Sequence, residues 1–388
     1  MGRRRGASDR ASVRQGHLAG AERASIMVAP YLRTGSQREE GLPRQSWEAH
    51  GPRRSHNHPL LSCGNAFFLR EVGAPSGRRG PASGSPMNDE LRADSVVGRI
   101  KTIFRFPIKS VGGRSITDTY VDMHGSLGDH RYAFIDVETG NLCNAKNPRK
   151  YGSLLACRAY YVDEPRPGQP LPTLEVVFPD GQAHRNVGTD LDDAMSRYLG
   201  RTVRLAEAVP SDAKTELVWD AATGLPKEGV YSHTTTNSDG DEVLTYGPLQ
   251  ANRFFDLTPL HFITTSTLNH FQRLEPTARF NPRRYRPTMV IDTPAPGLVE
   301  DAWVGGRLTI GAAVSASVDL CTPRCVMSTL AHGKDVPLDR ATLRTIAKHN
   351  SKSIGDFGRL ACAGVYATVT ATGPVRVGDP VRFESSSN

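Results

Sequence analysis

The sequence predicts an α+β chain that is mostly β, with a small β-barrel-like domain followed by a larger β-barrel-like domain that carries a few helices. Three observations favour this fold class. Many short segments alternate apolar and polar residues, turns rich in Gly and Pro separate them, and few segments have helical periodicity. The chain shows neither internal repeats nor a βαβαβ rhythm, so a doubly wound parallel sheet is not expected.

The first 86 residues differ in composition from the rest of the chain. Residues 1–86 contain 14 Arg, no Lys and six acidic residues, so they carry the whole net charge of +8 and leave 34 basic and 34 acidic residues for the remainder. The segment has no sustained periodicity, and we expect a disordered, Arg-rich tail. Its glutamates argue against a mitochondrial transit peptide, and a solvated tail is favoured over an RNA-binding arm. Met87 is an alternative start, which would make residues 1–86 non-physiological.

Composition also bears on location and partners. Because the part after the tail has no surplus of basic residues, we expect no nucleic-acid partner. The longest apolar stretch of the tail, AFFL, is far shorter than the ~20 residues of a membrane span, so we expect no membrane association. Six cysteines in a chain without a signal peptide favour a reducing compartment, and we expect a cytoplasmic protein without disulfides.

Residues 96–206 are expected to form the first domain. Within it, GRIKTIFRFPIKS alternates apolar and polar residues, which predicts a half-buried strand with Arg105 and Lys109 on its polar face. Two hairpins and a helix are expected to follow, at 131–146, 174–187 and 189–200.

The expected helix has signals at both ends. Thr189 can cap its first turn, and Asp192 stands three residues later, as in a capping box. Gly200 is a typical residue just past a helix end. The first domain is therefore rich in strands and has one short helix.

Residues 207–386 are expected to form the second domain. A polar stretch at 220–243 predicts a long surface loop or linker. The segment 260–274 then predicts a strand followed by a helix. Further strands are expected at 286–292, 307–320, 364–373 and 376–383, and a helix at 338–350.

Two cysteines lie four positions apart in DLCTPRCVMSTL. Cys321 ends an apolar strand, so a buried structural role is expected. A zinc site needs two more ligands, and His332 and Cys362 lie at spacings that match no common structural zinc site. Cys325 differs because Arg324 precedes it, and a guanidinium group favours the thiolate, which is both the nucleophile and the metal ligand. Thiolates select soft or redox-active metals.

Basic and hydroxyl side chains outside the tail predict an anion site. Each basic residue alone is more often a solvated charge, but arginine and lysine together are what hold phosphate. Thr264 and Thr265 precede the expected helix, whose N-terminus also suits a phosphate. The basic side chains in question are Lys109, Arg131, Lys146, Arg283, Arg284 and Arg286.

Six motifs, in order over about residues 96–383, resemble the MOSC family, named for the C-terminus of molybdenum cofactor sulfurase. They are IFRFPIKSVGGRSI, GDHRYAFID, NPRRYRPTMVID, CTPRCVMSTL, CAGVYATV and VRVGDPV. The resemblance implies a MOSC N-terminal β-barrel domain at 96–206 and a MOSC domain at 207–386. In this architecture the chain is similar to the mitochondrial amidoxime-reducing components and their bacterial homologues.

The resemblance also implies a molybdenum–molybdopterin cofactor (Moco) bound between the two domains. Its Arg-Cys dipeptide matches Arg324 and Cys325, which makes Cys325 the metal ligand and the catalytic residue. The cofactor-binding positions that it implies are Lys109, Ser110, Arg131, Thr264, Thr265, Arg286, Thr288 and Arg324.

The chain departs from the family pattern in four ways. Thr288 stands where the family's Arg-Pro-Asn motif has asparagine, and three residues instead of two separate Cys321 from Cys325. The membrane anchor of the mitochondrial relatives is absent, so we expect a soluble protein. The chain also lacks the pyridoxal phosphate domain of a complete cofactor sulfurase.

The activity implied by the resemblance is that of a molybdenum-dependent oxidoreductase. It would reduce small-molecule substrates of the N-hydroxylated or N-oxide type. Because the sequence has no haem, flavin or iron–sulfur motif, the electrons must come from a separate electron-donor protein. The alternative is a non-catalytic carrier of Moco or of sulfur, the latter as a persulfide on Cys325. A third reading is a structural or RNA-binding protein that uses the basic tail.

Overall fold

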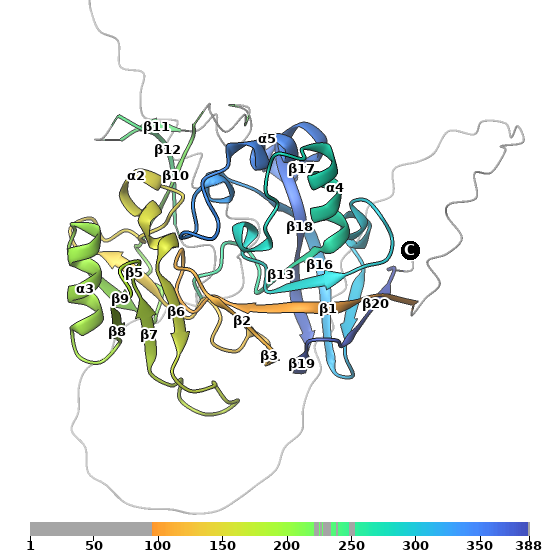
Figure 1. Ribbon diagram of the computed structural model, residues 1–388, viewed down its shortest axis with the longest axis horizontal. Helices are drawn as coiled ribbons and strands as arrows, with labels where there is room; N and C mark the ends of the chain where they lie inside the picture. Colours follow the sequence, from red (N-terminus) through yellow and green to blue (C-terminus); the bar gives the residue numbers. More distant parts are fainter. Residues whose placement is uncertain are drawn as a thin grey trace, which may run out of the picture.

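The computed structural model describes residues 95–220, 225, 227, 234–237, 240–247 and 253–386. The predicted tail, and most of the predicted linker at 220–243, lie outside the described residues. The largest feature of the described chain is a closed β-barrel of seven strands (Figure 1). The mostly β fold with barrels and a few helices is therefore confirmed.

The barrel closes because its last strand pairs with its first. Only β13 and β14 are parallel neighbours; the other neighbouring strands of the barrel are antiparallel. In order around the barrel, the strands are β13 (Leu260–Thr264), β14 (Met289–Asp292), β1 (Ser95–Arg105), β20 (Pro380–Glu384), β15 (Arg307–Ile310), β16 (Val314–Pro323) and β18 (Arg359–Ala371), which returns to β13. Two short strands extend it, β2 (Arg114–Ile116) on β1 and β17 (Ser351–Ser353) on β18.

Apolar side chains from every barrel strand fill its interior. Burying one such side chain contributes about 1.5–3 kcal/mol, so this core is the main stabilising element of the barrel. The core residues include Ile100, Ile103, Leu260, Phe262, Met289, Ile291, Leu308, Ile310, Val314, Ala316, Val318, Val365, Ala367, Val369, Val381 and Phe383.

Strand β1 links the two parts of the molecule. It pairs with β14 and β20, so the first strand of the proposed domain 96–206 is also a barrel strand (Figure 1). Its register shifts between Ile100 and Thr102, and the simple alternation ends there. The prediction that Arg105 faces solvent is wrong, because its guanidinium is buried and donates to the hydroxyl of Thr119 and to the carboxylate of Glu164.

Helices α4 (Thr265–Leu274) and α5 (Arg340–His349) cover one side of the barrel. Their apolar faces pack with the start of β18 in a second core, which includes Leu268, Phe271, Leu343 and Ile346. The oxygens of Thr264 and Asp339 accept hydrogen bonds from the first turns of α4 and α5. Both helices were predicted, and both are confirmed. In the described part of the chain, no helix has the length and apolar character needed to cross a membrane.

The other part of the molecule is built from short strands. One sheet contains β6 (Arg158–Tyr161), β7 (Leu174–Val177) and β8 (Ala183–Arg185), and β5 (Ala133–Asp136) pairs with β9 (Val203–Ala206). The predicted hairpin at 174–187 is confirmed as β7 and β8. The predicted hairpin at 131–146 forms only in part. Its first strand, β5, pairs with β9, and Leu142 makes only an isolated bridge to Ile135.

Helix α3 (Asp190–Leu199) packs beside these strands and confirms the predicted helix. Gly200 ends it in the left-handed conformation, with φ of +66°, a conformation that favours glycine. The predicted capping box does not form. Asp192 instead accepts a hydrogen bond from the backbone N–H of Leu205, and the Thr189 side chain makes no capping bond.

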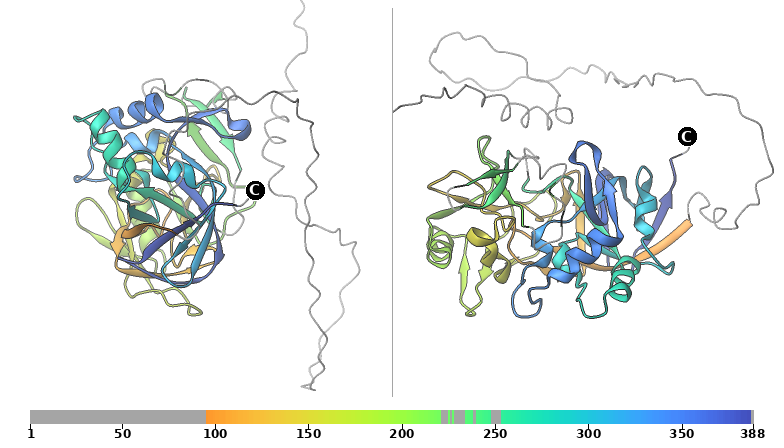
Figure 2. Two further views of the ribbon diagram at one scale, coloured as in Figure 1. Left: turned by 90° about the vertical axis from the view of Figure 1, so that its right-hand side faces the viewer. Right: turned by 90° about the horizontal axis from the view of Figure 1, so that it is seen from above.

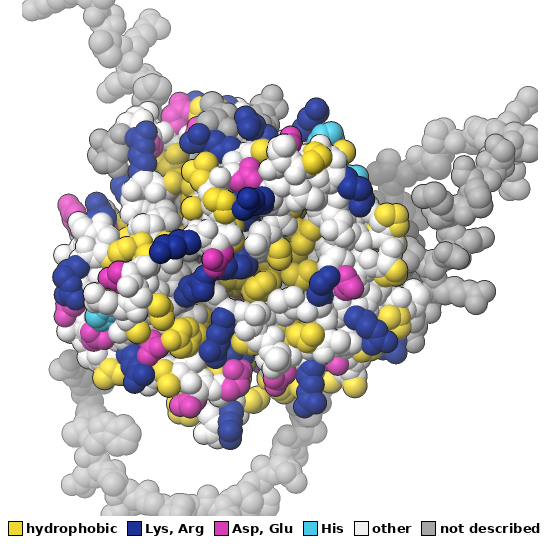
Figure 3. Space-filling view, viewed as in Figure 1, with side chains coloured by type: hydrophobic (Ala, Val, Ile, Leu, Met, Phe, Trp, Pro, Cys, Tyr) yellow, Lys and Arg dark blue, Asp and Glu magenta, His cyan; other side chains and the backbone are white. Residues whose placement is uncertain are grey.

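Smaller elements connect the two parts, which lie side by side in the views of Figures 1 and 2. The remaining strands are β3 (Asp118–Asp122) between β4 (Gly125–Ser126) and β19 (Gly373–Arg376), and β12 (Glu242–Tyr246) between β10 (Thr215–Val218) and β11 (Thr235–Thr236). The short helices are α2 (Pro148–Tyr151), η2 (Gly152–Ala156), η5 (Pro282–Tyr285), η6 (Val299–Trp303), η7 (Val326–Thr329) and η8 (Gly355–Phe357). On the face drawn in Figure 3, apolar side chains gather near the centre and lysine and arginine side chains lie around them.

Candidate functional site

A pocket lies where the loop after β1, the end of β16 and the loop before β14 meet. It brings together residues far apart in the sequence and from both parts of the molecule. Six of the predicted site residues line it: Lys109, Ser110, Arg286, Thr288, Arg324 and Cys325. Further lining residues include His130, Asn144, Asp256, His261, Arg284, Tyr285 and Tyr366.

Cys325 follows β16 and stands directly before η7. Of the cysteines in the described chain it is the one that is partly exposed, and all of these cysteines are free. Burial within the protein raises the pKa of its thiol, while the nearby Lys146 opposes this and Asp256 adds to it. Cys321 is buried, and its thiol donates to the Asp301 carboxylate over 3.4 Å. The described residues hold no group of three or more His, Cys, Asp or Glu side chains placed to bind a metal ion.

Arg324 acts on Cys325 in the predicted direction but weakly, and its guanidinium is bonded elsewhere in the structure. Its guanidinium turns into the end of the barrel, where it donates to the carbonyl oxygens of Ala363 (2.9 Å from Nε) and Tyr285 (3.0 Å from Nη1). It also contacts Nε2 of His261. Arg324 does lower the pKa of Cys325, but burial of the thiol has the larger effect and raises it.

His261 and Gly364 show how closely this side is packed. Nε2 of His261 faces Arg324 and Nδ1 faces the carbonyl oxygen of Arg286, so both ring nitrogens have partners. Burial and the neighbouring Arg324 charge hold the pKa of His261 well below its usual value, which keeps the ring neutral. Gly364 has φ of +82°, and a Cβ there would lie 2.4 Å from the oxygen of Phe262, so this position requires glycine.

Arg286 completes this side of the pocket. It ends η5 with φ of +50°, and its guanidinium donates to the carbonyl oxygens of Val111 (2.6 Å) and Ile108 (3.3 Å). The guanidinium lies 4.2 Å from the ring centre of Phe106, within cation–π range. Burial lowers its pKa to about 10, so it stays charged at neutral pH. We call Arg286, Arg324, His261 and Tyr285 the barrel wall.

Another part of the site contains two buried lysines that form ion pairs with the same carboxylate. Oδ1 of Asp256 lies 2.8 Å from Nζ of Lys109 and 2.9 Å from Nζ of Lys146. Lys109 also donates to the carbonyl oxygen of Phe254 (2.8 Å), and Lys146 to the hydroxyl of Tyr246 (3.0 Å). Burial alone raises the pKa of Asp256, but the two lysines outweigh it and hold this pKa far below its usual value. We call Lys109, Lys146, Asp256 and Asn144 the lysine wall; Lys146 does not itself line the pocket but pairs with Asp256, which does.

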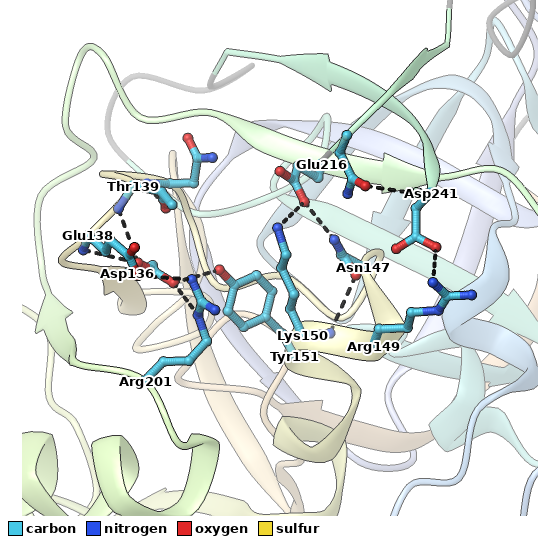
Figure 4. Close-up of polar contacts among 12 residues, drawn as sticks. Asp136, Glu138, Thr139, Asn147, Arg149, Lys150, Tyr151, Arg201, Glu216 and Asp241 are labelled. Carbon is cyan, nitrogen blue, oxygen red and sulfur yellow. Dashed lines mark hydrogen bonds and ion pairs between the residues drawn. The ribbon is translucent and has the colours of Figure 1, made fainter. Parts of the chain in front are cut away.

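The segment that follows Lys146 is bonded to the sheet β10–β12–β11 and the turn between β11 and β12, and Figure 4 draws the contacts of Asn147 and Arg149. The Asn147 amide donates to Glu216 over 2.6 Å, and Arg149 pairs with Asp241 over 2.7 Å. The backbone N–H of Val218 donates to the carbonyl oxygen of Lys146 over 3.0 Å. These contacts fix the segment that carries both Asn144 and Lys146.

The two walls together carry a surplus of positive charge. Lys109 and Lys146 share the single Asp256 carboxylate, while Arg286 donates to backbone carbonyls. Arg284, also buried, donates to carbonyl oxygens including that of Leu330 (3.1 Å). Carbonyl oxygens satisfy hydrogen bonds but leave the net charge in place, so the pocket favours an anionic ligand.

Three predicted residues are not brought into this pocket. Arg131 pairs at the surface with Glu207. The hydroxyl of Thr264 is buried and donates to Glu300 over 2.7 Å, and that of Thr265 donates to Asp292 over 2.8 Å. The start of α4 is thus occupied by carboxylates of the protein itself, which contradicts a phosphate contact there.

Thr288, where the family has asparagine, does line the pocket. Its hydroxyl oxygen accepts from the backbone N–H of His261 over 3.1 Å. A hydroxyl used in this way ties β13 to the residue before β14. It keeps its hydrogen and its second lone pair for a ligand.

Sequence reasoning missed Asp256, His261, Asn144 and Tyr285. Lys146 was recognised as a basic residue but not assigned to the site. Lys109, Lys146 and Asp256 come from three separate segments, so no local spacing indicates that they meet. Asn144 lies two residues before Lys146 in NAKNP, and that short polar motif was the one signal available.

Comparisons with known proteins identify the family. The family model of the MOSC N-terminal beta barrel domain matches residues 97–163, and that of the MOSC domain matches residues 250–382. The chain therefore belongs to the MOSC domain proteins that carry an N-terminal β-barrel domain. No curated protein matches it.

Among solved structures, the chain is similar to those of two bacterial proteins. The YUAD protein from Bacillus subtilis is 9% identical, with a TM-score of 0.33 over 75% of this chain and 97% of that protein. YiiM from Geobacillus stearothermophilus is 12% identical, with a TM-score of 0.23 over 32% of this chain and 54% of that protein.

Proposed function

We propose that this protein is a Moco-dependent oxidoreductase in which Cys325 binds the molybdenum. The observation that carries the proposal is a partly exposed cysteine that lines a pocket with a surplus of buried positive charge. MOSC domains are associated with the molybdenum cofactor, and the site lies between the two matched domains.

The residues present fit this cofactor. A thiolate suits molybdenum, and buried lysine and arginine side chains suit the phosphate and the charged dithiolene of molybdopterin. In addition, Asn144 and Tyr285 line the pocket, and the Asn144 amide nitrogen and the Tyr285 hydroxyl are buried without hydrogen-bond partners within the described part of the chain. Because such atoms are costly unless a ligand or water satisfies them, they indicate a polar ligand.

The charged residues of the two walls have two tasks in this proposal. Lys109, Lys146 and Arg286 hold the anionic groups, and Arg324 positions the loop before Cys325 by tying Ala363 to Tyr285. When bound, Moco supplies the two-electron chemistry, which no protein side chain provides. N-hydroxylated or N-oxide-type small molecules are the proposed substrates, with electrons from a separate protein.

The test is the metal and pterin content of protein from a host that makes the cofactor. We expect near-stoichiometric molybdenum and pterin in the wild type, and loss of both bound metal and N-hydroxylamine reduction in Cys325→Ser. Cys321→Ser is the matched control, because this cysteine is buried against Asp301, and it should keep the cofactor. Well-folded wild type without molybdenum or pterin would overturn the proposal. A mass increase of one sulfur atom on Cys325 would then support the sulfur-carrier alternative.

A further inference from the structure

The side chains of Ser110 and Asn144 form a linked pair in the wall of the pocket. The Ser110 hydroxyl donates to Oδ1 of Asn144 over 3.3 Å and accepts from the backbone N–H of Ala145 over 3.0 Å. Ser110 has φ of +62°, a conformation uncommon outside glycine. The single hydrogen of this hydroxyl is therefore used within the protein, and Ser110 has no donor left for an anionic ligand.

The orientation of the Asn144 amide follows from its partners. Oδ1 accepts from the backbone N–H of Lys146 over 3.0 Å, and a backbone N–H can only donate. The atom that faces Lys146 is therefore the oxygen, and Nδ2 must point the other way. Nδ2 is buried and has no hydrogen-bond partner among the residues that the structure describes, and Asn144, only 1% exposed, lines the pocket.

An amide nitrogen in this state carries two hydrogens and no acceptor. Leaving such a donor buried and unpaired is costly, whereas a ligand acceptor removes the cost. The backbone around Asn144 is itself fixed, because its carbonyl accepts from the N–H of Asn147 over 2.9 Å and Asn147 is held by Glu216. The donor is thus preorganised.

We infer that Asn144 is a ligand-binding residue of this site and that Ser110 is its positioning residue. The Asn144 amide donates to an acceptor oxygen or nitrogen of the bound anionic molecule, and Ser110 holds the amide in that orientation. This inference rests on the proposed cofactor function, and it moves the direct contact that the family resemblance gives to Ser110 onto Asn144.

The experiment measures cofactor binding and does not depend on turnover. Full-length wild type, Asn144→Ala, Ser110→Ala and the double variant are purified from a host without the cofactor and titrated with molybdopterin. We expect Asn144→Ala to raise the half-saturating concentration about tenfold, the value of one lost hydrogen bond to a charged group. Ser110→Ala should raise it less, and the double variant should equal Asn144→Ala alone, because Ser110 acts through Asn144.

Asn141→Ala is the matched control, since Asn141 lies on the same segment outside the pocket lining. Wild-type affinity in Asn144→Ala, or additive effects of the two substitutions, would overturn the inference. If Asn144→Ala does not fold, the asparagine side-chain amide signals of ¹⁵N-labelled wild type decide the question. We expect one of them to shift when molybdopterin binds, and an unchanged set would overturn the inference. Failure of the wild type to bind any molybdopterin would instead overturn the proposed function.

Discussion

The two walls of the pocket hold their charges by different means. In the barrel wall, Arg286 and Arg324 donate to backbone carbonyls of neighbouring segments. In the lysine wall, two ammonium groups depend on the one carboxylate of Asp256. The backbone carbonyls that bond the arginines are part of the fold itself. The two lysines, by contrast, both lose their counter-charge if the single carboxylate is lost. The following predictions test this difference, from the largest expected effect to the smallest.

Asp256→Asn should be the most damaging substitution. It leaves two buried ammonium groups without a counter-charge, and breaking a buried pair in this way costs about 3–5 kcal/mol of unfolding free energy. Urea denaturation measures the loss. Asp335→Asn is the control, because Asp335 pairs with Arg158 at the surface, and it should leave the midpoint almost unchanged. Equal effects of the two substitutions would contradict the assigned role of Asp256.

Arg324→Lys tests the barrel wall. A lysine keeps the charge but cannot reach several carbonyls with a planar fork, and each buried carbonyl left unpaired costs about 1–3 kcal/mol. We expect lower stability by denaturation even in the cofactor-free protein. A variant that matches the wild type without cofactor but binds it poorly would show that Arg324 serves the ligand and not the scaffold.

Lys146→Met should have a smaller effect on stability. Asp256 keeps Lys109 as its partner, so we expect a loss of about 1 kcal/mol, close to that of one hydrogen bond. Cofactor retention should fall more clearly, because one of the cations that favour an anion is gone. If the molybdenum and pterin content of Lys146→Met equals that of the wild type, Lys146 does not contribute to cofactor binding.

Asp136 lies outside both walls, and its interactions lead us to expect that the stability of the first part of the molecule depends on acidic pH. Burial raises its pKa, but bonds from Arg201, the N–H of Thr139 and the Tyr151 hydroxyl outweigh this and hold the pKa below its usual value (Figure 4). Its contribution is therefore complete above the unfolded-state pKa of about 4 and is lost as the pH falls through the lower folded-state pKa. Denaturation at a series of acidic pH values should show this loss in the wild type and a shallower slope in Asp136→Asn. Identical slopes would contradict it.

The sequence predicted strands and helices better than it predicted contacts. Periodicity and cap residues located α3, α4 and α5, because these signals are local. The family motifs placed Cys325 and five more predicted residues at one pocket. The hydroxyls of Thr264 and Thr265 were expected to contact a phosphate. They instead donate to the carboxylates of Glu300 and Asp292, which come from later segments and cannot be seen in the local sequence. Asp256 was missed for the same reason: its role depends on Lys109 and Lys146, both more than 100 positions away.

Strand β1 has a consequence for how this chain is synthesised. Ser95 pairs with Phe383 and Arg99 with Asp292, so the barrel cannot close until nearly the whole chain has left the ribosome. Until then β1 is a strand without its neighbours, and contacts of such long sequence separation form slowly. A fragment cut to the second family match alone lacks β1 and exposes the edges of β14 and β20, which invites association between copies. The N-terminal strand is thus required to close the C-terminal barrel.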